Sequence, residues 1–203
     1  MFFINRKNGI IFGSFSWTIA LSLFATAIRL YNRVVPSFRG LTHHLSDLGA
    51  GINSSNVVFM IGLALTEIFQ IPFYFSIGIK LKQKKGNWNL IRFALGGSII
   101  SCLSLILVIP FLSDPKNPIF YTMHGILGFT HFGTMTVAYI FYSIIELSNP
   151  KISKIFGLIS IYSALFYSLT IFFFTNCIIY WFAISGIFLW VFMHTVFLIR
   201  SKE

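Results

Sequence analysis

Long apolar runs without a charged side chain dominate this chain. Asp, Glu, Lys and Arg are absent from four stretches: Asn8–Ile28, Phe93–Ser113, Asn117–Ile145 and Ile155–Ile199. A further run, Leu48–Ile79, is interrupted only by Glu67. Hydrophobicity is continuous along these runs and does not alternate with a period of two, which favours helices over the strands of an outer-membrane barrel.

The lengths of the runs predict six membrane-spanning helices. An α-helix crosses the apolar core of a bilayer in about 20 residues. The last run is too long for one crossing and predicts a helical hairpin that turns near Thr175–Cys177. We therefore predict six transmembrane helices, at about 9–31, 55–79, 90–112, 119–145, 155–174 and 178–199. Residues 1–203 would then form a single all-α domain, a polytopic membrane helical bundle with one long outer loop at about 32–54.

The composition supports this fold class. Hydrophobic residues make up 56% of the chain and charged residues 10%, with a mean hydropathy of +0.82. Such a chain has too little polar surface to cover a globule in water, which excludes a soluble enzyme and a disordered tail. Its two cysteines, Cys102 and Cys177, have no metal-binding spacing and are too few for a secreted disulfide scaffold.

Basic residues are distributed unevenly between the two sides of the predicted bundle. With both termini cytoplasmic, that side holds eleven of the fifteen Lys and Arg residues: Arg6, Lys7, Lys80, Lys82, Lys84, Lys85, Arg92, Lys151, Lys154, Arg200 and Lys202. The other side keeps Arg29, Arg33, Arg39 and Lys116. Because translocation of Lys and Arg is disfavoured, this asymmetry predicts cytoplasmic termini and an even number of helices.

The net charge of +10 points to membrane lipids as partners. The cluster Lys80–Lys85 is expected to lie near anionic headgroups. No aromatic-interleaved motif accompanies the cluster, so nucleic acid is not an expected partner.

The first apolar run has two interpretations. Arg6 and Lys7, the run itself and Ala25-Thr26-Ala27 resemble a cleavable signal peptide. The run is longer than the usual core of a signal peptide and ends in Arg29 and Tyr31, which suit a membrane interface. We therefore expect a retained first helix.

The long outer loop contains an unusual group of polar residues. One of the chain's five carboxylates and two of its five histidines lie within five residues, as His43, His44 and Asp47. Ser46 or Asp47 could serve only to cap a short interfacial helix. The alternative is that His44, Ser46 and Asp47 belong to a polar site.

A second group follows the third predicted helix. Asp114 could simply start a turn at Asp114-Pro115, and His124 could simply donate to a backbone carbonyl. Together with Asp47 they could also hold a divalent metal such as zinc, or form an acid–base pair, at the outer face. The candidate metal ligands are therefore Asp47, Asp114 and His124.

These motifs resemble a known family. Ser46-Asp47-Leu48-Gly49, the stretch Ile109-Pro110-Phe111-Leu112-Ser113-Asp114 and His124 look like DUF998, a family of six-helix prokaryotic membrane proteins of uncharacterised activity. The layout is more distantly similar to the Frag1/DRAM/Sfk1 group. The resemblance covers most of the chain and implies a prokaryotic plasma-membrane protein with an outward-facing polar site, and it implies no reaction. The family usually has a shorter Phe-Pro-x-Asp element, so the match is weakest at Asp114.

Two ionisable residues fall in the middle of predicted helices. Glu67 and His131 each lie about 12 residues into a helix, roughly 18 Å from its outer end and near the bilayer midplane. An isolated charge at that depth is costly, so we expect these two side chains to approach each other or to share a polar cavity. Gln70 and Tyr74 continue the stripe of Glu67, either as cavity lining or as a hydrogen-bond network between helices.

Other polar residues in the helices suggest packing. Small residues recur as Ser14, Thr18 and Ser22, and as Gly97, Ser101 and Ser104, which predicts seams of close helix approach. His194 is expected to meet the C-terminal dipole of the last helix.

Three functions fit these features. The first is binding, sensing or moving a lipid or small amphiphile through an outward-facing polar cavity, without catalysis. The second is a metal-dependent membrane hydrolase that uses the outer Asp and His residues. A serine nucleophile is not expected, because no GxSxG motif accompanies Ser46. The third is a proton-coupled transporter that uses Glu67. We favour the first.

Overall fold

The computed structural model describes residues 5–34, 43–50, 54–111, 117–173 and 175–200. This part of the chain contains helices and no strand. In chain order the elements are α1 (Arg6–Asn32), the short 3-10 helix η1 (Leu45–Leu48), α2 (Ser55–Gln83), α3 (Trp88–Val108), α4 (Pro118–Ser148), α5 (Lys154–Phe172) and α6 (Cys177–Arg200). The prediction of an all-α chain with six long helices is confirmed.

The helix ends follow from local chemistry. Asn5, Asn87 and Asn117 cap α1, α3 and α4, each accepting a hydrogen bond from a backbone N–H of the first turn. These caps place the starts one to three residues before the predicted ones. The end of α3 comes earlier than predicted, because Pro110 has no N–H and restricts the residue before it.

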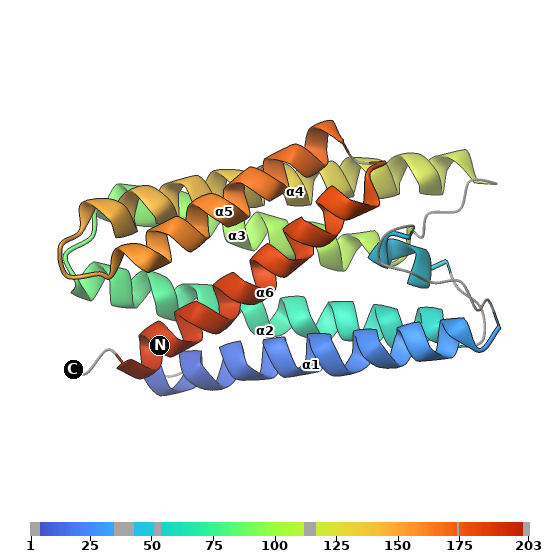
Figure 1. Ribbon diagram of the computed structural model, residues 1–203, viewed down its shortest axis with the longest axis horizontal. Helices are drawn as coiled ribbons and strands as arrows, with labels where there is room; N and C mark the ends of the chain where they lie inside the picture. Colours follow the sequence, from blue (N-terminus) through green and yellow to red (C-terminus); the bar gives the residue numbers. More distant parts are fainter. Residues whose placement is uncertain (1–4, 35–42, 51–53, 112–116, 174, 201–203) are drawn as a thin grey trace.

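The six long helices form a closed ring. Each helix packs against its neighbours in the sequence, and α6 returns to pack against α1. Consecutive helices run in opposite directions, so the N- and C-terminal ends of the chain lie at the same end of the bundle (Figure 1). We call that end the termini end. The opposite end, where η1 lies, is the η1 end.

The outward surface of the ring is apolar. Large hydrophobic side chains are exposed on all six helices, among them Phe15, Ile61, Phe93, Ile126, Leu158 and Phe192. Five helices are long and apolar enough to cross a membrane: α1, α2, α3, α5 and α6. The remaining helix, α4, is the longest, at 31 residues. It carries His124, His131 and several threonines among its apolar residues. These features identify a membrane protein.

The interior differs between the two ends. Toward the termini end, a plug of large aromatic side chains fills the ring: Phe73, Tyr74, Tyr139, Tyr142, Tyr167 and Trp190. At the η1 end, Leu45 and Leu48 of η1 are buried against α1 and α2. The short helix therefore acts as an apolar insert that partly closes this end of the ring.

The close helix contacts confirm one predicted seam and correct the other. On α3, Ser101 and Ser104 are buried, and Gly97 meets the backbone of α4. On α1, Ser14, Thr18 and Ser22 are exposed, so the predicted seam on this helix is wrong. The seam of α1 lies on its other face, where Gly13 approaches the Phe73 ring so closely that a Cβ would come within 2.8 Å of it. The small residues on this inward face include Gly13, Ser16 and Ala20.

Candidate functional site

A large cavity occupies the η1 half of the ring, with a volume of about 620 Å³. Residues from all six long helices and from η1 line it. Most of the lining is apolar, with a small number of polar side chains among aromatic and aliphatic ones. Both the size and the chemistry of this lining are typical of sites that enclose a small organic ligand, for which volumes of about 300–1,000 Å³ are usual.

The structure brings the described candidate residues to this cavity. His44, Ser46 and Asp47 line it from η1, and His124 and His131 line it from α4. Glu67 lines it from α2. The remaining candidate, Asp114, lies outside the described residues.

Glu67 lies well inside the bundle. By the rise of an α-helix it is about 18 Å from the start of α2. Its side chain is only 3% exposed, and it interacts with the thiol of Cys102 on α3. Within the described residues the Glu67 carboxyl forms no ion pair. One turn further along α2, the Tyr74 hydroxyl donates to Gln70 Oε1 of the same helix over 2.9 Å and contacts Met135 Sδ of α4 at 4.0 Å. Gln70 also lines the cavity.

His131 lies at a similar depth on α4, in a mixed polar and aromatic environment. Its Nδ1 is hydrogen-bonded to Ser101 Oγ of α3 over 2.7 Å. The rings of Phe132 and Tyr167 pack around the imidazole at centroid distances of 5.0 and 5.5 Å. Glu67 and His131 thus line the same cavity, and each interacts with a different residue of α3.

The rim of the cavity is held by η1. The Asp47 carboxylate accepts a hydrogen bond of 2.9 Å from the His44 backbone N–H, so Asp47 does cap the short helix. The Trp181 indole N–H of α6 donates to the His43 carbonyl over 2.9 Å, and the Tyr180 ring packs edge-on against His44. Burial lowers the pKa of His44 from its ordinary value of 6.5, more strongly than the Asp47 carboxylate raises it. The rim is therefore an ordered structure with one carboxylate and a histidine that favours its neutral form.

His124 joins the rim to the end of α3. Its Nδ1 lies 2.9 Å from the Phe111 carbonyl, and because a carbonyl can only accept, Nδ1 carries the proton. Nε2 remains as an acceptor. Among the described residues no group of three His, Cys, Asp or Glu side chains is placed to hold a metal ion. Asp47 and His124, the two candidate metal ligands that the structure describes, therefore have no third ligand among the described residues.

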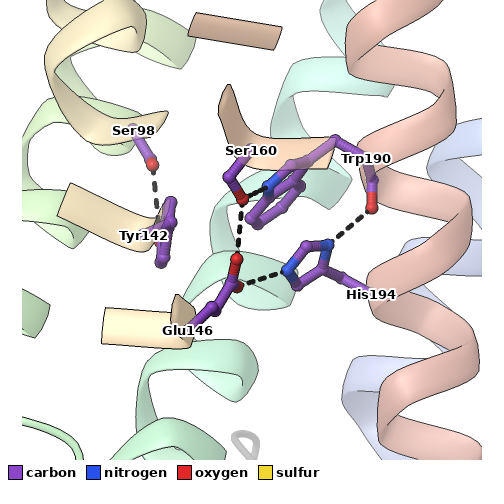
Figure 2. A network of polar contacts seen from close by, with 6 residues as sticks. All are labelled: Ser98, Tyr142, Glu146, Ser160, Trp190 and His194. Atoms are coloured by element: carbon purple, nitrogen blue, oxygen red, sulfur yellow. Dashed lines mark hydrogen bonds and ion pairs between the residues drawn. The ribbon is translucent and has the colours of Figure 1, made fainter. Parts of the chain in front are cut away.

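A second polar centre, at the termini end, was missed from the sequence. Figure 2 shows Glu146 of α4 facing His194 of α6, with Glu146 Oε1 at 2.6 Å from His194 Nε2. Ser160 Oγ of α5 donates to Glu146 Oε2 over 2.8 Å and accepts from the Trp190 indole N–H over 2.9 Å. His194 and Glu146 are each only 1% exposed. The expected role of His194, at the dipole of its helix, is replaced by a side-chain ion pair or hydrogen bond.

Hydrogen-bond chemistry fixes most protons of this network. His194 Nδ1 faces the Trp190 carbonyl at 2.9 Å and must therefore carry a proton. One further proton lies between Nε2 and Glu146 Oε1, whichever atom holds it. The imidazole also stacks on the Trp190 ring, with centroids 3.8 Å apart. Every polar atom of the pair has a partner, which is the condition for a buried polar network to hold helices together.

Glu146 was missed because the predicted fourth helix ended one residue before it. The helix continues to Ser148, so Glu146 lies on the inward face that also carries His131, Met135 and Tyr142. Extending this face, with its spacing of three to four residues, past position 145 would have found Glu146.

The aromatic plug separates the two polar centres. The residues that line the cavity and those of the Glu146–His194 network do not overlap. Tyr142 of the plug packs against the Trp190 ring at a centroid distance of 5.0 Å, and its hydroxyl lies 3.5 Å from Ser98 Oγ. The cavity is therefore a pocket with a packed floor, and the network beneath it fastens α4, α5 and α6.

No protein-family model matches this chain, and comparison with curated proteins and with solved structures finds no match either.

Proposed function

We propose that this membrane protein binds a lipid or small amphiphile in the cavity at the η1 end. The observation that carries the proposal is the cavity itself, about 620 Å³ in volume and lined by residues of all six long helices. A ligand in such a site is surrounded by protein, which is what specific binding of a small molecule requires.

The chemistry of the lining supports an amphiphilic ligand. Apolar side chains such as Phe24, Phe59 and Ile187 offer a surface for a hydrocarbon chain. Glu67, Gln70 and His131 offer polar atoms in the interior. Polar groups at such depth in a membrane are costly when they lack partners, and a ligand with a polar group supplies partners.

We propose that the termini end faces the cytoplasm and the η1 end faces outward. The termini end carries Lys80, Lys82, Lys84, Lys85 and Arg92 among other basic residues, whereas the η1 end has only Arg29 and Arg33 in the described chain. The positive-inside rule then supports cytoplasmic termini and a cavity that opens toward the outer face.

Two glycines of α4 provide the test. A Cβ added at Gly128 or at Gly133 meets no atom within 4 Å, so both positions have open space beside the backbone. Gly128 lines the cavity and Gly133 does not. Gly128→Leu therefore fills the cavity, and Gly133→Leu is its matched control on the same helix.

The measurement is calorimetric titration of the purified protein in phosphatidylcholine nanodiscs, with n-decanol, n-decylammonium and n-decanoate as probes. Empty nanodiscs correct for partitioning into lipid. We expect saturable binding of at least one probe, a loss of about tenfold or more in Gly128→Leu, and unchanged binding in Gly133→Leu. No saturable binding of any probe, or equal losses in both variants, would overturn the proposal.

A further inference from the structure

Among the described residues, the lining of the cavity contains acidic and no basic Lys or Arg residues, whereas the protein as a whole is basic. The chain has 15 Lys and Arg residues and only 5 Asp and Glu residues. Nevertheless, no Lys or Arg is among the described residues that line the cavity, whereas Asp47 and Glu67 both are. The described lining thus offers two carboxyl groups and no Lys or Arg side chain, and carboxylates attract oppositely charged ligands.

Glu67 lacks a positive partner within the described chain. Its neighbour Cys102 is a thiol, and His131 is hydrogen-bonded to Ser101 instead. Glu146 provides the contrast, because this second buried carboxylate has His194 at 2.6 Å. An ionised carboxylate in an apolar interior is strongly unfavourable unless a cation accompanies it.

The aromatic lining favours the same kind of ligand. Trp17, Phe132, Tyr167 and Tyr180 contribute rings to the cavity. The face of an aromatic ring carries negative charge density and attracts a positively charged nitrogen. An anionic headgroup, by contrast, would meet two carboxylates and no Lys or Arg side chain among the described lining.

From this arrangement we infer that the ligand is a cationic amphiphile, with a protonated amine or quaternary ammonium group that pairs with Glu67 and an apolar part among the aromatic side chains. Asp47 at the rim attracts the cation on entry. The inference rests on the proposed function and names the class of amphiphile that the cavity selects.

The same three probes test the inference, because they share a ten-carbon chain and differ in charge. An alkylammonium, like the lysine side chain, stays protonated at neutral pH. We expect decylammonium to bind the wild-type protein at least about tenfold more tightly than decanol, because close charge pairs in desolvated sites add to the binding free energy. Decanoate should bind most weakly.

Glu67→Gln removes the charge and keeps the shape of the side chain. In this variant we expect the preference for decylammonium over decanol to be lost. A cooperative thermal unfolding transition of the variant shows that it is folded. Glu67→Asp keeps the charge and should retain the preference for the cation.

The possible failures are distinct. Equal binding of decylammonium and decanol to the wild type, tightest binding of decanoate, or a cation preference that survives Glu67→Gln would each overturn the inference and leave the amphiphile cavity standing. If none of the three probes binds saturably, the proposed function fails as well.

Discussion

The two buried carboxylates of the described helices lie in opposite environments. Glu146 is held by His194 and Ser160 in a network without an open polar site. Glu67 faces a cavity and interacts with the thiol of Cys102, with no ion pair among the described residues. Residues of the same type thus have different roles, one fastening helices and the other lining a site, and the difference comes from what the neighbouring helices place opposite each carboxylate.

Removing either partner of the Glu146–His194 pair should destabilise the protein strongly. We expect Glu146→Leu or His194→Leu alone to lower the free energy of unfolding by about 3–5 kcal/mol, because each leaves a buried polar group without its partner. The double variant should cost clearly less than the sum of the two single changes. Denaturation of the purified protein in mild detergent measures these differences, and additive losses would show that the pair is not coupled.

At the scale of the helix, packing depends on which face meets a neighbour. Gly96 and Gly97 are adjacent on α3, yet a Cβ at Gly97 would lie 2.8 Å from the Thr134 carbonyl oxygen of α4, and one at Gly96 meets nothing within 4 Å. The α3–α4 contact therefore requires a glycine at one of the two positions and tolerates a larger residue at the other.

These neighbouring glycines predict opposite effects of the same substitution. Gly96→Ala should stabilise the protein by up to about 1 kcal/mol, because alanine favours a helix over glycine. Gly97→Ala should destabilise it by about 1–3 kcal/mol, because α3 and α4 must move apart. Thermal unfolding of the two variants and the wild type under identical conditions measures these changes in stability. Changes of the same sign and size in both would contradict the close contact.

At the scale of the whole molecule, the two ends of the ring differ in charge and in packing. The termini end is basic and closed by the aromatic plug, and the η1 end is poor in basic residues and contains the cavity. This polarity along the bundle axis is what an oriented membrane protein with a one-sided binding site requires.

The orientation can be measured by cysteine labelling in intact cells. Ala50 at the η1 end and Ser153 at the termini end are both exposed. In a Cys177→Ser background, we expect a membrane-impermeant maleimide to label Ala50→Cys directly and Ser153→Cys only after lysis. The reverse pattern would place the cavity on the cytoplasmic side.

The apolar runs alone were sufficient to predict all six long helices and the all-α class. A helix in lipid must form its backbone hydrogen bonds within itself, and it carries apolar side chains toward both lipid and core along its whole length. The same reasoning marked Glu67 and His131, since ionisable residues in the middle of an apolar run are costly. It failed where a residue lay at a predicted helix end, as Glu146 did, and where two faces of a helix were similar, as on α1.

Only the tertiary structure decided what these side chains meet. The return of α6 to α1 closes the ring and creates the cavity, and the insertion of η1 builds its rim. The contact of Glu146 with His194 joins residues 48 positions apart. The physical reason is that hydrophobicity and length are properties of each segment by itself, whereas a cavity or a charge pair depends on how separate helices are rotated and packed against one another.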